Sequence, residues 1–249
     1  MKVLLTGSSG RIGRAVAAEL VRRGHVVRGF DIAATPGLDD MIVGTLTDRA
    51  AVDRAMAGRE TLIHLAATPD DDDFMSALLP NNIVGVHHVL ESARDCGVGR
   101  MILASSGQVV WHERDRATSP IRVDTVPTPK YWYAAAKLFL EGAGRAFAEN
   151  FGMSVLAVRL GWCPRTREQV EEIRGIDWAQ DVYLSPNDAG RFFAHAVESA
   201  EPRGYAVVYA TSRPVVRSRY DMEPTRRLTG FVAEEQWPMG TETVLADCR

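Results

Sequence analysis

The stretch Thr6-Gly7-Ser8-Ser9-Gly10-Arg11-Ile12-Gly13 joins a short apolar run to a segment with helical periodicity. Glycines at such a turn let the backbone bend tightly and approach a pyrophosphate at the N-terminus of the following helix. The spacing is G-x-x-G-x-x-G, rather than the G-x-G-x-x-G of the general dinucleotide fingerprint. A glycine-rich turn without a ligand is the alternative, but the position after the first strand favours a dinucleotide site.

Apolar runs and helical segments alternate along most of the chain. The predicted buried strands are residues 3–6, 26–30, 61–65, 101–104, 154–158 and 206–209, and the predicted helices are residues 11–23, 48–57, 81–95, 133–150 and 186–199. This alternation indicates right-handed crossovers and a parallel sheet covered on both faces. We therefore expect an α/β fold with a doubly wound parallel sheet. It forms a single domain, 1–249, in which residues 1–160 are mainly dinucleotide-binding core and residues 161–249 supply substrate-covering loops, a final strand and helices.

The composition excludes several classes of protein. A net charge of −3 argues against a general nucleic-acid binder, and no run of 18 apolar residues is present to span a membrane. The N-terminus lacks a signal-peptide pattern, so a cytoplasmic location is expected. Cys96, Cys163 and Cys248 are odd in number and lack metal-ligand spacing, which makes a disulfide framework unexpected.

Asp31 ends the second predicted strand, eighteen residues beyond Gly13. A carboxylate at this point accepts hydrogen bonds from both hydroxyls of an adenosine ribose and repels a 2′-phosphate. Ile32 follows where an arginine would favour NADP, so NAD is the predicted cofactor. Arg11 is the nearby cation that would soften this preference. A surface cap at the strand end is the alternative role for Asp31.

Three polar residues have the spacing of a proton-transfer site. Ser106 follows the fourth predicted strand, Tyr133 comes 27 residues later, and Lys137 lies four residues beyond on the same helix face. We expect the Lys137 ammonium to lower the pKa of the Tyr133 phenol, and Ser106 to donate to a substrate oxygen. A solvated helix face and a serine turn are the ordinary alternatives, but the coincidence of all three favours catalysis.

At this point the chain resembles the extended short-chain dehydrogenase/reductases, over roughly residues 1 to 165. The resemblance implies a Rossmann sheet, NAD at the glycine turn and catalysis by Ser106, Tyr133 and Lys137. The residues that it assigns to NAD are Gly7, Gly10, Arg11, Ile12, Gly13, Asp31, Leu46, Leu65, Ala66, Ala67, Asn82, Tyr133 and Lys137. One departure is Thr45, where members often carry the aspartate of an Asp-Leu pair. Asn82 either holds a backbone kink near the site or is a helix-surface amide.

Within that branch the chain is most similar to the uronate dehydrogenases, which oxidise the anomeric carbon of a free hexuronic acid to a lactone. The features are the compact length, Asn82-Ile83-Val84-Gly85, Val158-Arg159-Leu160-Gly161-Trp162-Cys163 and residues 178–184. By its position relative to Trp178, Arg174 matches the arginine that holds the uronate carboxylate; a salt-bridged helix is the alternative. The implied substrate residues are Thr68, Ser106, Gly107, Gln108, Tyr133 and Arg174. Gly107-Gln108 and Thr68-Pro69 depart from the Asn-His and Ser of those enzymes.

Two other functions stay open. A sugar epimerase would retain NAD and recycle it internally, whereas Gly107-Gln108 lacks the Asp-Glu pair of the dehydratases. A non-catalytic NAD-sensing protein is the second alternative, although such relatives usually lose the Tyr-Lys pair.

The remaining expectations concern partners and metals. The resemblance implies a homodimer through the helices around 81–95 and 133–150. The run from Asp70 to Asp73 is interpreted as a helix cap, and no metal site is predicted.

Overall fold

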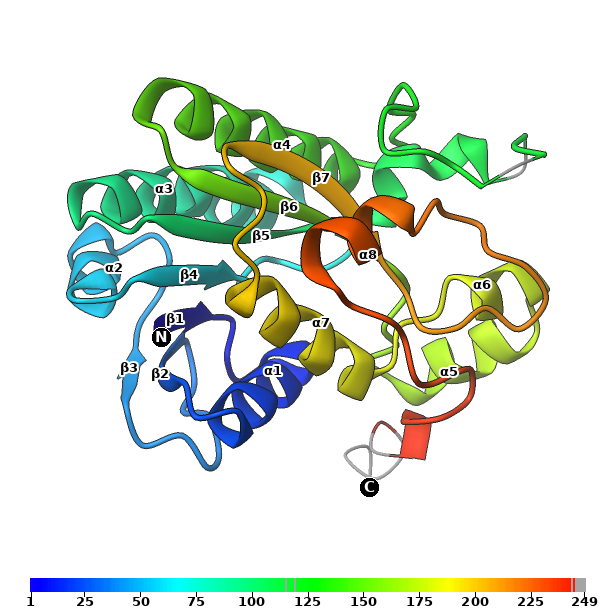
Figure 1. The fold of residues 1–249 in the computed structure, drawn as a ribbon, viewed down its shortest axis with the longest axis horizontal. Coiled ribbons are helices and arrows are strands. Elements are labelled where there is room, and N and C mark those ends of the chain that lie inside the picture. Colours follow the sequence, from blue (N-terminus) through cyan, green and yellow to red (C-terminus); the bar gives the residue numbers. More distant parts are fainter. Residues whose placement is uncertain (115, 119, 243, 245–249) are drawn as a thin grey trace.

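Seven parallel strands form one sheet in the computed structural model, which describes residues 1–114, 116–118, 120–242 and 244 (Figure 1). The strands are β1 (Lys2–Thr6), β2 (Val26–Asp31), β3 (Met41–Val43), β4 (Thr61–His64), β5 (Arg100–Ser106), β6 (Ser154–Leu160) and β7 (Tyr205–Ala210). Their order in the sheet is β3-β2-β1-β4-β5-β6-β7. The direction of winding reverses between β1 and β4, and ligands bind beyond the carboxyl ends of strands at such a switch point. The predicted doubly wound parallel sheet is therefore confirmed.

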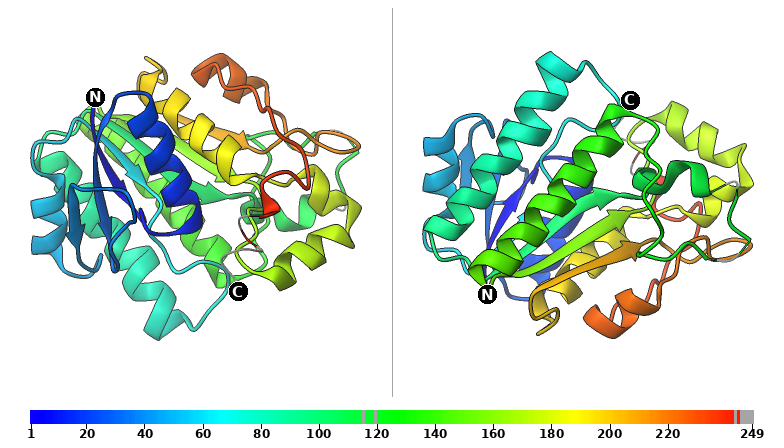
Figure 2. Two further views of the ribbon diagram at one scale, coloured as in Figure 1. Left: turned by 90° about the horizontal axis from the view of Figure 1, so that it is seen from below. Right: turned by 90° about the horizontal axis from the view of Figure 1, so that it is seen from above.

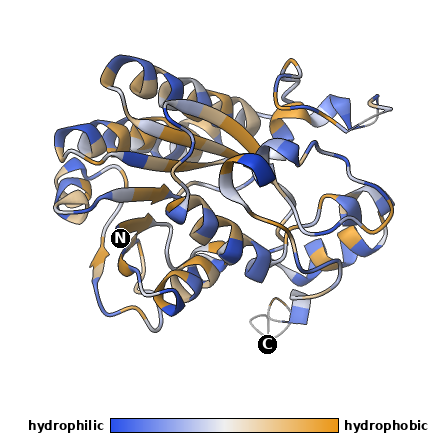
Figure 3. Cartoon of the chain, viewed as in Figure 1, coloured by the Kyte–Doolittle hydropathy of each residue, from blue (hydrophilic) through white to orange (hydrophobic). Residues whose placement is uncertain are grey.

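Helices cover both faces of the sheet and enclose a separate core on each (Figure 2). One core lies beneath α1 (Arg11–Arg22) and α7 (Pro186–Glu198), and the other beneath α2 (Arg49–Met56), α3 (Gly85–Asp95) and α4 (Trp132–Phe151). The strands are coloured toward the hydrophobic end of the scale, whereas the helices carry both colours (Figure 3). Each fully buried leucine, valine or phenylalanine stabilises the fold by roughly 1.5–3 kcal/mol.

Short polar side chains set the start of several helices. Asp48 accepts a hydrogen bond from the Ala51 amide at 3.0 Å at the start of α2, and Ser185 accepts one from the Asp188 amide at 3.0 Å at the start of α7. Such caps satisfy backbone amides that lack a partner within the helix, and each contributes about 1 kcal/mol.

The structure contains elements that periodicity did not predict. β3 is only three residues long, and the predicted helix at 81–95 is divided into a wide, π-type helix η1 (Phe74–Val84) and α3. Pro80 lies inside η1, where it cannot donate to the preceding turn. The additional elements are η2 (Gly107–Glu113), α5 (Arg167–Arg174), α6 (Asp177–Asp181) and α8 (Glu223–Thr229).

Two further observations bear on the expectations from composition. Among the residues that the structure describes, no helix has the length and apolar character needed to cross a membrane. Cys96 and Cys163 are free thiols, and Cys248 lies outside the described residues.

Candidate functional site

The glycine turn between β1 and α1 combines two glycines that packing requires with one that it does not. Gly7 has a φ of +74°, and a Cβ there would lie 2.6 Å from the Ala66 amide nitrogen. A Cβ on Gly13 would overlap the Gly7 carbonyl oxygen. Gly10 is exposed, and a Cβ there would meet nothing nearer than the Gly7 carbonyl oxygen at 3.4 Å. Because the protein itself leaves this room, the open face at Gly10 fits the approach of a ligand such as NAD.

A cleft of about 490 Å³ opens at the carboxyl ends of β1 and β4, beside the glycine turn. Asp31 borders it at the end of β2, and one of its carboxylate oxygens accepts a hydrogen bond from the Ser9 amide at 3.0 Å. Tyr133 and Lys137 border the cleft from α4. The predicted NAD residues that line it are Gly7, Gly10, Arg11, Ile12, Gly13, Asp31, Leu46, Leu65, Ala66, Ala67, Tyr133 and Lys137.

Asn82 does not line the cleft and instead fixes the backbone of Thr68. Its side-chain oxygen accepts from the Thr68 amide at 2.8 Å, and its side-chain nitrogen donates to the Thr68 carbonyl oxygen at 3.0 Å. Asn82 is 2% exposed and lies in η1, where the widened helix brings it to the loop after β4. Of the two roles expected for Asn82, the structure matches the one that shapes the backbone near the site.

The two neighbouring serines at the end of β5 have different partners. Ser105 donates a hydrogen bond of 2.6 Å to Glu141, which Arg159 also contacts through two nitrogens at 2.9 Å. Ser106 lies close enough to Tyr133 for its hydroxyl to act against the rise in the pKa of the phenol, and this hydroxyl accepts a hydrogen bond from the Gln108 amide at 3.2 Å. Successive side chains of a strand point to opposite faces of the sheet. Ser105 therefore contacts the buried Glu141–Arg159 pair, whereas Ser106 faces Tyr133.

Burial changes the expected proton affinity of the Tyr133–Lys137 pair. Lys137 is 7% exposed, donates to the Ala104 carbonyl oxygen at 2.8 Å, and has its pKa lowered to about 8 by burial. The pKa of Tyr133 is raised, first by burial and then by the charge of Asp70, while Arg165 and Ser106 act in the opposite direction. The pKa of Tyr133 thus shifts in the direction opposite to the one expected from Lys137, because desolvation of the buried phenol outweighs the groups that lower its pKa.

His64 ends β4 beneath the site without bordering the cleft. Its ring nitrogen Nδ1 lies 2.8 Å from the Thr6 hydroxyl, and the residue is 3% exposed. Burial, and after it the charge of Lys137, lowers the pKa of His64 to about 3. This histidine is neutral and structural at physiological pH.

Arg165 borders the cleft, as Arg11 does, whereas Arg174 does not. Arg165 borders the cleft and pairs with Asp70, whose carboxylate also accepts from Gln169 and Gln108 at 3.3 Å each. Arg174 lies on α5 with 59% of its side chain exposed, and it pairs with Glu171 at 2.7 Å. The structure thus corrects the placement expected for Arg174, which forms the salt-bridged helix surface that was its alternative. Relative spacing to Trp178 could not reveal which arginine faces inward, and the acidic run from Asp70 to Asp73 gave no sign that Asp70 pairs with Arg165.

The other predicted substrate residues surround the cleft without lining it. Gly107 is buried against Tyr220, because a Cβ at Gly107 would overlap the Tyr220 hydroxyl. Thr68 is held by Asn82, and Gln108 reaches the site only through Asp70. In the acidic run, Asp73 caps η1 by accepting from the Ser76 amide at 2.8 Å, so the cap interpretation is confirmed for this residue alone.

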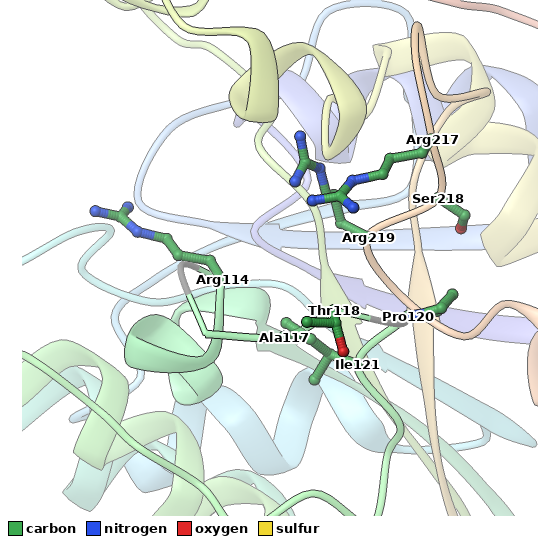
Figure 4. Close-up of a pocket in the computed structure, with 8 residues that line it drawn as sticks. All are labelled: Arg114, Ala117, Thr118, Pro120, Ile121, Arg217, Ser218 and Arg219. Atoms are coloured by element: carbon green, nitrogen blue, oxygen red, sulfur yellow. The ribbon is translucent and has the colours of Figure 1, made fainter.

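A second pocket of about 230 Å³ lies beyond the loop that follows η2 (Figure 4). Arg114, Arg217 and Arg219 line it, and the guanidinium groups of Arg217 and Arg219 lie close together in the view. Arg219 donates to Asp181 at 2.9 Å, while Arg114 stacks over Trp111, 3.7 Å from the ring centre. This pocket shares no lining residue with the larger cleft, which Tyr133 and Lys137 border, and Ser106 is not among the residues that line either one.

A parallel sheet that carries a dinucleotide cleft at its switch point is the framework of the short-chain dehydrogenase/reductases. The chain belongs to their extended branch, since residues 3–162 match the NAD dependent epimerase/dehydratase family. This membership confirms the predicted family, the predicted class of NAD-dependent enzyme, and NAD as the cofactor.

Individual relatives are sugar-oxidising enzymes by name. An NAD-dependent glucose-6-phosphate dehydrogenase of Haloferax volcanii is 30% identical over 92% of this chain and 91% of its own. An L-arabinose 1-dehydrogenase (NAD(P)(+)) of the same organism is 28% identical over 81% of this chain and 84% of its own. The solved structure of a mutated uronate dehydrogenase is 25% identical with a TM-score of 0.80, covering 99% of this chain and 86% of that one. The predicted resemblance to uronate dehydrogenases is therefore confirmed.

Proposed function

We propose that the protein oxidises the anomeric carbon of a free sugar or sugar acid to a lactone, with NAD as the hydride acceptor and with Ser106, Tyr133 and Lys137 as the catalytic residues. The observation that carries the proposal is that Tyr133 and Lys137 border one cleft, where the Ser106 hydroxyl acts on the Tyr133 phenol. The names of the relatives support this reaction, because they oxidise an aldose, a sugar phosphate or a uronate.

The reaction breaks the C1–H and O1–H bonds of the cyclic sugar and forms the C1=O bond of the lactone. NAD, when bound, supplies the acceptor for the hydride that leaves C1. The proton of O1 passes to the oxygen of Tyr133, and Ser106 holds O1 by a hydrogen bond while the proton moves. Before each turnover the phenol gives up its own proton to solvent, and the charge of Arg165 and the Ser106 hydroxyl favour this ionisation.

The glycine turn, Asp31 and α4 each contribute to the binding of NAD. Gly10 leaves room for the pyrophosphate at the start of α1, and Asp31 accepts hydrogen bonds from the ribose hydroxyls of the adenosine. Lys137 supplies an ammonium that borders the same cleft from α4. The negative charge of Asp31 disfavours a 2′-phosphate, which is the basis for proposing NAD rather than NADP.

The test is a spectrophotometric screen for NADH at 340 nm with neutral aldoses, aldose phosphates and uronates. We expect net NADH formation with at least one sugar, and loss of at least a thousandfold in kcat for Tyr133→Phe. Absence of NADH throughout the panel would overturn the dehydrogenase. Isomerised sugar with NAD retained on the protein would instead identify an epimerase, and full activity of Tyr133→Phe would remove the tyrosine from the mechanism.

We also propose a cytoplasmic homodimer that packs through α3 and α4, which lie side by side on one face of the sheet (Figure 2). Phe139 of α4 is 41% exposed and Val84, just before α3, is 38% exposed, so this face offers apolar surface to a second copy. Cys96 is an exposed free thiol, which a reducing compartment preserves. Sedimentation equilibrium should give a dimer for the wild type and a monomer for Phe139→Glu, and a wild-type monomer would refute the interface.

A further inference from the structure

We propose that Asp70 determines substrate specificity by occupying Arg165, so that the site favours a neutral aldose over a uronate. The inference rests on the proposed function and narrows it to one class of sugar. It concerns a contact between the loop after β4 and the loop after β6, which lie 95 residues apart in the sequence.

Asp70 is held in place by side chains from three separate segments. Arg165 and Gln169 both donate to its Oδ2 atom, and Gln108 donates to Oδ1 at 3.3 Å. The backbone of Asp70 has a φ of 60°, a left-handed conformation that aspartate adopts more readily than most residues with a Cβ. The position of this carboxylate is therefore built into the site.

Asp70 reaches the cleft through Arg165, although Asp70 is not itself among the residues that line it. Arg165 borders the same cleft as Tyr133, and Asp71, the next residue along, accepts from the Tyr133 amide at 3.3 Å. The charges of both Asp70 and Arg165 act on the Tyr133 phenol. A sugar positioned against Tyr133 thus meets the Asp70–Arg165 pair.

The pair changes what the cleft can bind. An arginine alone at this point would take the carboxylate of a uronate in a bidentate contact. With Asp70 already on Arg165, the pair carries no net charge, and a second carboxylate beside Asp70 is repelled. An ionised carboxylate has about four acceptor positions, and the three donors leave capacity for a sugar hydroxyl. The geometry therefore suits a hydroxyl better than a carboxylate.

The neighbouring aspartates do not share this role. Asp73 caps η1, and Asp72 is exposed and accepts from the Asp73 amide at 2.7 Å. Asp72→Asn is accordingly a matched control for Asp70→Asn, since both variants remove one charge from the same loop and keep the side-chain size.

The experiment compares galactose with galacturonate, which differ only in the group at C6. For the wild type we expect kcat/KM to be at least tenfold higher for galactose. Asp70→Asn releases Arg165 and should shift this ratio toward galacturonate by tenfold or more, whereas Asp72→Asn leaves the ratio as in the wild type. Adding Arg165→Gln to Asp70→Asn should cancel the shift. A wild type that prefers galacturonate, or an unchanged ratio in Asp70→Asn, would overturn the proposal.

Calorimetric binding of galacturonate to the NADH-loaded protein separates this inference from the proposed function. We expect Asp70→Asn to bind galacturonate at least tenfold more tightly than the wild type, with thermal unfolding showing that both are folded. If no sugar yields NADH, the proposed dehydrogenase fails and the binding measurement still decides the role of Asp70. Equal affinities in the two proteins would then overturn that role.

Discussion

The Nζ atom of Lys137 donates a hydrogen bond to the carbonyl oxygen of Ala104 at 2.8 Å, and this contact joins α4 to the end of β5. One turn further along α4, Glu141 binds Ser105 and Arg159. Two successive turns of the helix are thus attached to successive residues of the strand that carries Ser106. This attachment sets the position of Ser106 relative to Tyr133, one turn back on the same helix.

Replacement of Tyr133 by phenylalanine removes the proton acceptor and keeps the ring. We expect kcat for sugar oxidation to fall at least a thousandfold, while the Kd for NAD changes by less than tenfold, because the glycine turn and Asp31 are intact. Steady-state assays and fluorescence titration with NADH measure the two quantities. Tyr131→Phe is the control and should retain wild-type activity.

The raised pKa of Tyr133 predicts that sugar oxidation speeds up with pH. The phenol is protonated at neutral pH, and only the ionised form accepts the substrate proton, so kcat/KM should rise with pH from 6 to 8. Above pH about 8 the slope should decrease, because Lys137 begins to lose its charge. Asp70→Asn removes a charge that raises the pKa of Tyr133, so its profile should lie at lower pH. If kcat/KM did not change with pH in either the wild type or Asp70→Asn, the role given to ionisation of Tyr133 would be contradicted.

Asp31 is predicted to exclude NADP. In Asp31→Ser the repulsion of the 2′-phosphate is gone, and we expect the ratio of kcat/KM for NAD over NADP to fall by at least tenfold. Parallel assays with the two cofactors give the ratio, and Asp39→Ser, an exposed position nearby in the sequence, should leave it unchanged. Equal use of NADP by the wild type would show that Arg11 outweighs Asp31.

Two glutamates of α4, one paired with an arginine of β6 and one with an arginine of α4 itself, should differ sharply in their effect on stability. Glu141 pairs with Arg159 with side-chain exposures of 9% and 4%, whereas Glu149 and Arg145 are 61% and 65% exposed. Glu141→Ala leaves a buried charge without its partner, and we expect a loss of about 3–5 kcal/mol in the free energy of unfolding. Glu149→Ala should leave that free energy nearly unchanged. Urea unfolding measures both, and similar losses would disprove the distinction.

His64 should make the fold less stable as the pH falls. Its pKa is about 3 in the folded protein against an ordinary value of 6.5, so below pH 6.5 the unfolded chain binds a proton that the folded protein does not. Between pH 7 and pH 5 this difference amounts to about 2 kcal/mol of lost stability. His64→Asn should remove that portion of the pH dependence in urea unfolding, and His87→Asn, on the exposed side of α3, should not. Identical pH slopes in all three proteins would contradict the assignment.

Much of the fold could be predicted from the sequence because the patterns that indicate it extend over only a few neighbouring residues. The glycine turn, the long buried strands and the four-residue spacing of Tyr133 and Lys137 each follow from short-range geometry, and the structure places them as expected. β3 escaped prediction because three residues are too few to show a period. The division of 81–95 escaped it because a π-type helix departs from the regular repeat.

The sequence by itself determined the doubly wound sheet, the family and the cofactor, since these depend on residue types at fixed spacing. Only the tertiary structure decided that Arg165 and not Arg174 borders the cleft, and that Asp70 lies on Arg165. It also reversed the expected shift in the pKa of Tyr133, because desolvation depends on everything packed around the phenol. Contacts between loops 95 residues apart and the burial of single groups leave no periodic trace in the chain.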